Sequence, residues 1–362
     1  MKKFSLFLTI VATTLISCSK WTETERITFE NQNLKKLVTL IEAQKESDLN
    51  PEYREYYKKI REEYRTKPRV KGFGWFGNWS GKGNNPQNYL RALPDSVDFV
   101  SAWGVRGKLT KEQQVDMEFF QKVKGGKVLL CWIIQDLGDQ LTPPKTDPRD
   151  FWVNQKGGGS FSEGVKAYAN AICDTIEKYN FDGFDIDYEP GYGHSGSLAN
   201  WQTIEGNHPM QIFIETLSAR LKPKGRMLVM DGQPDKLSTE TSKLIDHYIY
   251  QAYWEGSTVS VMRKINKTHL DDWERKTIIT VEFEQTWRTG GIDGYRSSKP
   301  EIQALKEGRQ ILDYSVFDLP SGKRIGGVGT YHMEYDYPNS PNYKWLRKAL
   351  YYGNQKYPGK FD

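Results

Sequence analysis

The sequence predicts an α/β protein of the (β/α)8 TIM barrel class, preceded by a helical tether. Three observations lead to this prediction. From about residue 67, short runs of apolar, β-branched or aromatic residues alternate with longer segments whose apolar residues recur at helical spacing. Eight such runs can be counted. The segment 67–362 also has the length of a barrel of about 250 residues with inserted loops.

Each of the eight apolar runs is expected to form one barrel strand, because repeated strand-helix units favour a parallel sheet. In chain order the expected strands are Val70–Phe76, Val97–Trp103, Lys127–Ile134, Phe181–Glu189, Arg226–Asp231, His247–Tyr253, Thr277–Phe283 and Gly326–Met333. The expected helices between them include Lys111–Val123, Glu163–Tyr179, Met210–Leu221 and Glu301–Leu312.

A doubly wound sheet is the second possibility for the same alternating pattern. Such a sheet would carry a glycine-rich phosphate loop after its first strand. Gly72, Gly74 and Gly77 have a suitable spacing, but they lie within the predicted strand and no helix opens there. The barrel is therefore preferred.

The first residues predict export and lipid anchoring. Two lysines precede an uncharged apolar stretch, Phe4–Ser17, that is too short to span a membrane. The stretch ends in Leu15-Ile16-Ser17-Cys18, which resembles the bacterial lipobox. We therefore expect residues 1–17 to be a signal peptide, Cys18 to be lipidated, and the protein to reside at the outer membrane, on the cell surface or the periplasmic face. An ordinary secretory peptide is the alternative.

Residues 18–66 are polar and heavily charged, and Pro51 stands at a plausible first helical position. We interpret this segment as a helical tether between the lipid and the barrel. It could instead pack on the barrel as an extra layer. The remaining chain, 67–362, is assigned to a single barrel domain.

Charge and cysteine content exclude several classes of partner. The chain has 51 basic and 46 acidic residues, a balance that gives no argument for nucleic-acid binding. Cys131 and Cys173 are too few for a disulfide framework and are expected to be buried thiols. None of the 5 histidines has metal-binding spacing to another histidine or cysteine, so no metal or other cofactor is predicted. The protein is expected to be a monomer.

The predicted fourth strand carries an unusual row of acids. Because successive side chains of a strand point to opposite faces, Asp185, Asp187 and Glu189 share one face while Phe184 and its apolar neighbours share the other. The acids are therefore expected to line the barrel interior. Glu189 comes last, at the carboxyl end of the strand, where barrel enzymes place their active sites.

Three acids that converge in a low-dielectric interior cannot all ionise cheaply, so at least one is expected to keep a proton at neutral pH. A protonated Glu189 at the barrel mouth would be a general acid for a glycosidic oxygen. A calcium loop is the alternative for such spacing. It would need a glycine at its sixth position and a glutamate at its twelfth, and this run has neither.

The run Asp182-Gly183-Phe184-Asp185-Ile186-Asp187-Tyr188-Glu189 resembles the Asp-Gly-x-Asp-x-Asp-x-Glu signature of glycoside hydrolase family 18, which contains chitinases and endo-β-N-acetylglucosaminidases. The resemblance implies a mechanism without a protein nucleophile, in which the acetamido group of the substrate attacks the anomeric carbon. Glu189 would then protonate the leaving oxygen and later activate water. Asp187 would orient the acetamido group, and Asp185 would share a proton with Asp187.

Two further segments resemble the family. Gln251 and Tyr253 fall on one face of the predicted sixth strand. A Gln-x-Tyr pair there resembles endo-β-N-acetylglucosaminidases more than chitinases, and implies hydrogen bonds to the acetamido carbonyl. Tyr331 on the predicted eighth strand stands where the family commonly has a tryptophan under the sugar. This departure leaves stacking possible but weaker.

Further candidate substrate contacts are chosen by position alone. They are Asp182 at the start of the acidic run, the acids Asp231, Glu282 and Glu284 near strand ends, and the tryptophans Trp75, Trp79, Trp103, Trp132, Trp254 and Trp287. Each aromatic ring could equally belong to the core.

These expectations combine into an endo-β-N-acetylglucosaminidase that cuts the GlcNAc-β1,4-GlcNAc core of N-linked glycans with retention at the anomeric carbon. The expected partner is an N-glycan or N-glycoprotein. A chitinase that cuts β1,4-GlcNAc polymers is the alternative enzyme. A non-catalytic glycan-binding lipoprotein on the same barrel is the alternative from another class.

Overall fold

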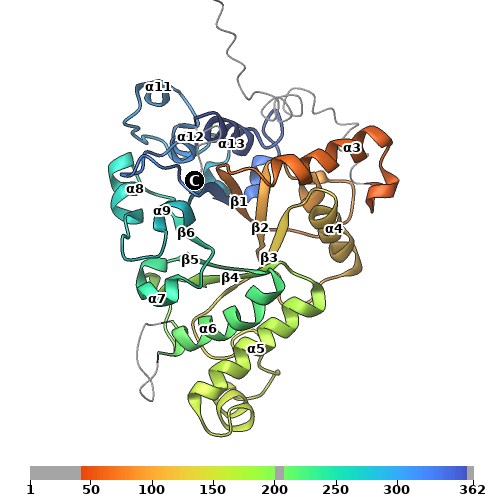
Figure 1. Cartoon of the computed structure of the whole chain (residues 1–362), viewed down its shortest axis with the longest axis vertical. Coiled ribbons are helices and arrows are strands. Elements are labelled where there is room, and N and C mark those ends of the chain that lie inside the picture. The colour runs from red at the N-terminus through yellow and green to blue at the C-terminus, as the bar shows by residue number, and fades with distance from the viewer. Residues whose placement is uncertain (1–41, 200–207, 357–362) are drawn as a thin grey trace, which may run out of the picture.

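The computed structural model describes residues 42–199 and 208–356, and within them the chain forms a closed barrel of eight parallel strands (Figure 1). Each strand pairs with its neighbours in chain order, and β1 pairs with β8 to close the barrel. The predicted (β/α)8 fold is confirmed. The signal peptide and Cys18 lie outside the described residues.

All eight expected strands are present, each within a few residues of its predicted bounds. The strands are β1 Lys71–Phe76, β2 Val97–Ala102, β3 Lys127–Ile133, β4 Gly183–Tyr188, β5 Met227–Gly232, β6 His247–Gln251, β7 Thr277–Glu282 and β8 Gly327–Tyr331. Because β4 ends at Tyr188 and β6 at Gln251, Glu189 and Tyr253 stand just beyond their strands rather than within them.

Helices surround the barrel, and α5 and α6 run side by side along one flank (Figure 1). The described α-helices are α3 Pro51–Lys59, α4 Lys111–Lys122, α5 Phe161–Tyr179, α6 Pro209–Leu221, α7 Thr239–Ser242, α8 Thr258–Ile265, α9 Trp273–Lys276, α10 Phe283–Thr286, α11 Pro300–Gln303, α12 Arg309–Ser315 and α13 Lys344–Lys356. Short 3₁₀ segments are η1 Glu46–Asp48, η3 Pro86–Asn88, η4 Leu90–Ala92, η6 Pro190–Tyr192, η7 Lys222–Lys224, η8 Pro234–Lys236 and η9 Met333–Asp336, and π segments are η2 Ile60–Tyr64 and η5 Asp150–Lys156.

Side-chain caps define several helix starts. The Thr110 hydroxyl accepts a hydrogen bond from the backbone of Gln113, and the side-chain oxygen of Gln113 accepts one from the backbone of Thr110, so α4 begins with a capping box. Asn50 accepts from the backbone of Tyr53 at the start of α3, which has Pro51 at its first position as predicted.

The single helix predicted for Glu301–Leu312 is wrong: the segment is divided between α11 and α12. Gly308 precedes α12 with φ of +77°, which lies outside the helical region. A Cβ atom at this position would come within 2.3 Å of the Trp345 ring. The close approach to α13 therefore requires glycine here, and glycine ends the helical periodicity.

Apolar side chains form one cluster inside the barrel and a second, larger cluster between the strands and the helices. Phe73, Phe99 and Val229 belong to the interior cluster. Phe184 and Ile186 of β4 belong instead to the larger cluster between the strands and the helices. The predicted alternation of β4 is thus confirmed, with its apolar residues outward and its acids inward.

Residues 42–66, the described part of the expected tether, pack on the barrel. Tyr57, Ile60 and Tyr64 form a small buried cluster with Phe119 of α4. Arg61 donates from Nη1 to the carbonyl of residue 123 at 2.7 Å. Of the two alternatives for this segment, the described residues adopt the extra layer.

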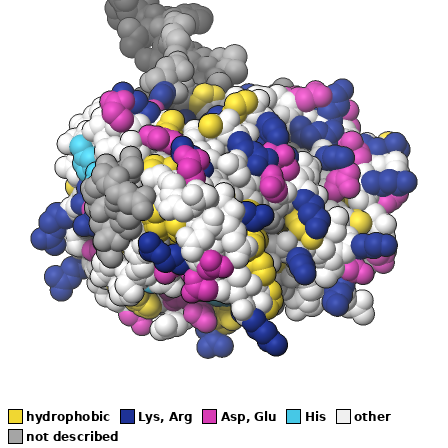
Figure 2. Space-filling view, turned by 90° about the horizontal axis from the view of Figure 1, so that it is seen from below, with side chains coloured by type: hydrophobic (Ala, Val, Ile, Leu, Met, Phe, Trp, Pro, Cys, Tyr) yellow, Lys and Arg dark blue, Asp and Glu magenta, His cyan; other side chains and the backbone are white. Residues whose placement is uncertain are grey.

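The surface and the cysteines agree with the expectations from composition. On the face drawn in Figure 2, basic and acidic side chains are interspersed rather than gathered in a stripe of one sign. Cys131 and Cys173 are buried free thiols. Among the described helices, none has both the length and the apolar character needed to cross a membrane.

Candidate active site

The acidic row of β4 ends at the open, carboxyl end of the barrel. Asp185 and Asp187 are buried within the strand, whereas the Glu189 side chain, one residue beyond it, is 19% exposed. The structure therefore places two acids inside the barrel and a third at the mouth, where a substrate can reach it.

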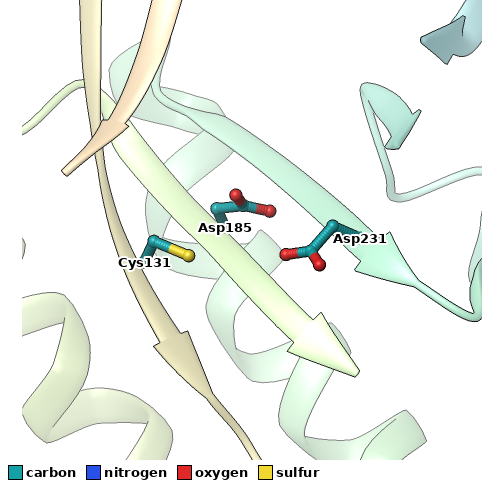
Figure 3. Close-up of side chains that lie close together, drawn as sticks. All are labelled: Cys131, Asp185 and Asp231. Atoms are coloured by element: carbon teal, nitrogen blue, oxygen red, sulfur yellow. The ribbon is translucent and has the colours of Figure 1, made fainter. Parts of the chain in front are cut away.

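Asp185, the deepest acid, is enclosed by polar side chains from neighbouring strands. Ser101 of β2 donates from its hydroxyl to Oδ2 of Asp185 at 2.5 Å. Figure 3 shows Cys131 of β3 and Asp231 of β5 with their side chains turned toward Asp185. Ser101 was not predicted as a site residue.

Asp231 connects the inner and outer parts of the acidic row. It is the partner of Asp187 in the parallel pairing of β5 with β4. Its Oδ1 accepts a hydrogen bond from Nε2 of Gln251 at 2.9 Å. Oδ2 of Asp231, Oδ1 of Asp187 and Oδ1 of Asp185 are buried and have no geometrically acceptable donor among the described residues. Each of the three buried aspartates therefore has one oxygen without a donor.

Glu189 is held at the mouth by the neighbouring strand and loop. Gly232, the last residue of β5, has φ of +81°, and a Cβ atom there would come within 2.8 Å of Cγ of Glu189. Glycine is thus needed both for the backbone and for the room that Glu189 occupies. His194, in the loop after β4, has Nε2 at 3.8 Å from a Glu189 carboxylate oxygen.

Burial raises the pKa of each inward aspartate, and no lysine or arginine of the described residues forms an ion pair that would oppose the shift. Burial raises the pKa of Asp185 to about 6. Burial, followed by the charges of Glu189 and Asp185, raises the pKa of Asp187 well above its usual range. Burial and the charge of Asp187 do the same to the pKa of Asp231. The expectation that at least one inward acid keeps a proton at neutral pH agrees with these directions.

Aromatic rings line the interior beside the acids. The Tyr331 ring centroid lies 5.7 Å from that of Trp103, 5.9 Å from that of Tyr253 and 6.1 Å from that of Trp75. Trp75 is fully buried, whereas Tyr253 and Tyr331 are partly exposed. Of the candidate aromatic contacts, these two tyrosines and Trp103 can meet a sugar at the mouth, and Trp75 supports them from below.

Trp254, another candidate, follows β6 and is 59% exposed. Its ring is available at the surface, beyond the end of the strand. Gln251 remains partly buried at the end of β6, with one of its two amide hydrogens directed to Asp231.

Two acidic candidates from the sequence use their carboxylates as acceptors for backbone N–H groups. Asp182 precedes β4 at the amino end of the barrel, where its Oδ2 accepts from Gln121 Nε2 and from the backbone of Val128. It connects β3, β4 and α4 and does not reach the mouth. Glu282 accepts from the backbones of Glu284 and Gln285 and thereby caps α10.

Two of the candidate tryptophans are core residues. The Trp79 indole donates to Asp116 at 2.8 Å, and the Trp132 indole donates to the carbonyl of Val105 at 2.7 Å. Both rings belong to the outer apolar cluster rather than the barrel interior. Of the two alternatives left open for these rings, the structure shows the core: alternation along β3 turns Trp132 toward the helices, and Trp79 packs there from the loop after β1.

Ligand atoms of Asp187, Glu189 and Asp231, and separately those of Cys131, Asp185 and Asp231, lie within 4.8 Å of one another. Such spacing would also suit a cation. Burial and the nearby aspartates raise the pKa of the Cys131 thiol well above its usual range, so this sulfur is a poor ligand. The absence of a metal cofactor stays a prediction.

Ser101 and His194 are the site residues that the sequence analysis missed. Ser101 occupies the same inward face of β2 as Phe99, and this alternation was the available signal. His194 lies in a loop, where no periodicity indicates the direction of a side chain.

Comparison with known proteins places this arrangement in a family. The family model described as glycoside hydrolase family 18, BT1044-like, matches residues 37–351. A solved structure of selenomethionine BT1044, in which one glutamate is replaced by glutamine, is 74% identical, with a TM-score of 0.86. The match covers 89% of this chain and 99% of that chain. No curated protein matches the chain.

More distant structures share the fold. An apo endo-β-N-acetylglucosaminidase from Cordyceps militaris is 16% identical with a TM-score of 0.56, over 83% of this chain and 96% of that chain. A double mutant of the same fungal enzyme, in complex with fucosyl-N-acetylglucosamine-Asn, is 17% identical with a TM-score of 0.56, over 83% and 95%. At this identity the likeness shows a common barrel and no more.

Proposed function

Because this chain belongs to glycoside hydrolase family 18, we propose that it is an endo-β-N-acetylglucosaminidase that hydrolyses the GlcNAc-β1,4-GlcNAc core of N-linked glycans. The observation that carries the proposal is the position of the three β4 acids. Asp185 and Asp187 are enclosed, and Glu189 alone is partly exposed at the mouth. One acid is thus available to the glycosidic oxygen while two support it from below.

In the proposed mechanism the acetamido oxygen of the substrate attacks the anomeric carbon, and Glu189 protonates the leaving oxygen. The product of this step is an oxazolinium ion, with positive charge spread toward its nitrogen. Asp187, next inward on the same face, accepts the N–H of the acetamido group. Glu189 then takes a proton from water, which opens the ring and restores the original anomeric configuration.

Substrate-assisted catalysis needs no second carboxylate as nucleophile, and the burial of the inward acids supports such a mechanism. The inward acids other than Glu189 are buried beneath it and lack the exposure that a nucleophile facing the sugar would need. The second amide hydrogen of Gln251 and the hydroxyl of Tyr253 are the proposed donors to the acetamido carbonyl. Tyr331 is the proposed stacking surface for the sugar ring.

A chitinase is the alternative enzyme, and Gln251 is the observation against it. The Gln-x-Tyr pair is partly exposed at the end of β6, and Gln251 contacts Asp231 of the acidic site. This position suits the donors to the acetamido carbonyl that we propose for an endo-β-N-acetylglucosaminidase. A non-catalytic glycan binder is the alternative from another class. Retention of Glu189 at the mouth argues against a binder, because binding alone does not need a proton donor there.

The test is digestion of high-mannose, hybrid and complex N-glycoproteins, followed by mass spectrometry. We expect a single GlcNAc to remain on asparagine with at least one of the three substrates. Cleavage of chitin oligosaccharides without release from any glycoprotein would favour the chitinase. Glycan binding with no change of mass, in reactions where a control glycosidase works, would favour the binder.

We also propose that the protein is a lipoprotein of the outer membrane, held through Cys18. The support is the apolar leader that ends in this cysteine. The test is metabolic labelling with a fatty acid in a bacterial host. Label and membrane association should both be lost in Cys18→Ser, whereas Cys173→Ser, which changes a buried thiol of α5, should keep both.

A further inference from the structure

His332 stands directly after Tyr331, the last residue of β8, at the carboxyl end of the barrel. Its ring centroid lies 4.4 Å from that of Tyr331 in an edge-to-face arrangement. In the order of the closed barrel, β8 lies across from β4, after which Glu189 follows. A sugar that stacks on Tyr331 and presents its glycosidic oxygen to Glu189 therefore has the His332 imidazole within reach.

The His332 ring is held by a buried acid. Nδ1 of His332 lies 2.6 Å from Oε1 of Glu334, a residue that is fully buried. Glu334 also accepts from the backbone of Gly77 at 2.9 Å and from Nδ2 of Asn78 at 3.3 Å. A Cβ atom at Gly77 would come within 2.6 Å of the His332 ring, so glycine provides the room that the ring occupies. Contacts from the ends of β1 and β8 thus fix the orientation of the imidazole.

The backbone and the second ring nitrogen of His332 indicate a use beyond packing. His332 has φ of +48°, in the left-handed region that few residues other than glycine adopt. Such conformations persist only where the surroundings hold them, and they concentrate at functional sites. Within the described part of the chain Nε2 makes no hydrogen bond, and the His332 side chain is 14% exposed. One nitrogen is therefore tied to Glu334 while the other remains available at the barrel mouth.

The acids around His332 limit what Nε2 can bind. Glu334, Glu284 and Glu282 all act on the charge of the imidazole, so an anionic ligand would meet three carboxylates. A sugar hydroxyl carries no charge. It can donate or accept a hydrogen bond, so it suits Nε2 whether the imidazole is neutral or protonated.

We propose that His332 is a substrate-binding residue whose Nε2 forms a hydrogen bond with a hydroxyl of the neutral sugar stacked on Tyr331. Glu334 is the positioning residue that orients the imidazole for this contact. The proposal rests on the proposed function for the presence of a sugar on Tyr331. In the rival explanation His332 is only the counterion of the buried Glu334 and touches no substrate.

Two substitutions separate the two explanations, because each keeps one of the two ring nitrogens. Asn places its amide group about where Nδ1 stands and tolerates the left-handed backbone, so His332→Asn keeps the bond to Glu334 and loses the contact with the sugar. Gln places its amide group about where Nε2 stands. His332→Gln therefore keeps a group for the sugar hydroxyl and loses the bond to Glu334.

Binding is measured by isothermal titration calorimetry in the Glu189→Gln background, where no turnover disturbs the titration. The probes are glycopeptides that carry a high-mannose, a hybrid or a complex N-glycan, and a chitin tetrasaccharide. For the probe that binds most tightly, we expect Kd to rise about tenfold in His332→Asn and by less than about threefold in His332→Gln. The melting temperature should fall by a few degrees only in His332→Gln.

Unchanged affinity in His332→Asn would overturn the proposal, as would the absence of binding by every probe. Equal losses of affinity and melting temperature in both variants would favour the counterion explanation and also overturn it. The matched control is His269→Asn, which changes an exposed histidine in the loop before α9 and should keep the affinity and melting temperature of its background.

Kinetics in the active protein distinguish this proposal from the proposed function. We expect His332→Asn to raise KM about tenfold and to leave kcat within about twofold, because the hydrogen bond is made equally in the ground state and the transition state. Failure of the parent protein to cleave any glycoprotein would refute the proposed function. The binding comparison would still decide the role of His332, because it requires no cleavage.

Discussion

Buried carboxyls occur at both ends of the barrel, but the two sets have opposite surroundings. At the amino end, Asp98 accepts from both terminal nitrogens of Arg69, and Arg65 Nη1 lies 3.4 Å from the same carboxylate. Burial alone would raise the pKa of Asp98. The charges of Arg69, Lys71 and Arg65 outweigh it and hold the pKa well below its usual range.

At the carboxyl end, Asp185, Asp187 and Asp231 are equally buried but form no ion pair with lysine or arginine in the described part of the chain. Their pKa values are raised instead. The same side chain is therefore a stabilising counterion at one end and a proton carrier at the other. Depletion of cations, rather than burial, distinguishes the candidate active site from the structural cluster.

The largest expected effect is a loss of activity without a loss of stability when the acid at the barrel mouth is substituted. Glu189→Gln should lower kcat/KM on the glycoprotein substrate by about 10²–10⁴-fold, because the amide cannot supply the proton. The melting temperature should stay within a few degrees of the parent, since Glu189 pairs with no lysine or arginine in the described residues. The measurements are initial rates by mass spectrometry and a calorimetric scan. A variant as active as the parent would remove Glu189 from the role of acid.

At the amino end of the barrel we expect the opposite result, a loss of stability without a loss of activity. Asp98→Ala should lower the free energy of unfolding by roughly 3–5 kcal/mol, because it leaves the buried cations Arg69 and Arg65 without their counterion. Denaturant unfolding measures this loss. Activity per folded molecule should be preserved, since Asp98 lies at the opposite end of the barrel from Glu189. Loss of activity without loss of stability in Asp98→Ala would contradict a purely structural role for the amino-end cluster.

The pH dependence of stability should also differ between the ends. The folded-state pKa of Asp185 is raised to about 6, so the folded protein binds more protons than the unfolded chain between about pH 4 and pH 6. The free energy of unfolding should fall as pH rises through this window, on the order of 1–3 kcal/mol for this group. Asp185→Asn should reduce that slope in denaturant titrations at pH 4.5 and 7.

Asp98 contributes in the opposite sense. Because its pKa is lowered, its stabilisation is fully present above the unfolded-state value near pH 4 and is lost only as pH falls below it. Asp98→Ala should therefore keep the parental slope between pH 4.5 and 7. If Asp98→Ala lost this slope and Asp185→Asn retained it, the pH dependence of stability would come from the amino end of the barrel and not from the acids at the carboxyl end.

The smallest expected effect concerns the segment that covers the amino end. The Tyr56 hydroxyl of α3 donates to Asp95 at 2.8 Å, and Lys124 pairs with the same carboxylate at 2.9 Å. Tyr56→Phe should lower the free energy of unfolding by about 0.5–1.5 kcal/mol, the contribution of one hydrogen bond to a charged group that keeps its ion pair. Tyr352→Phe, at an exposed tyrosine of α13, is a control of the same chemistry. No change in Tyr56→Phe would indicate that the lysine alone supports Asp95.

The sequence alone determined the features that depend on local geometry. Eight apolar runs predicted eight strands, and period-two alternation predicted that Asp185 and Asp187 would face inward beneath Glu189. Alternation depends only on the backbone of one strand, so it can be read without knowledge of the neighbours. The acidic run itself, through its resemblance to a known signature, predicted the family that the family model confirms.

The tertiary structure decided what depends on register and on contacts between distant segments. Closure of the barrel sets Asp187 opposite Asp231 and brings Ser101 to Asp185, across 44 and 84 residues of chain. Contact with Trp345 forced the break at Gly308. Asp182 belongs to the same acidic run as Glu189, yet the length of β4 holds it at the opposite end of the barrel. Neighbours in sequence were separated and distant residues joined, because each strand borders segments whose positions are fixed only when the barrel closes.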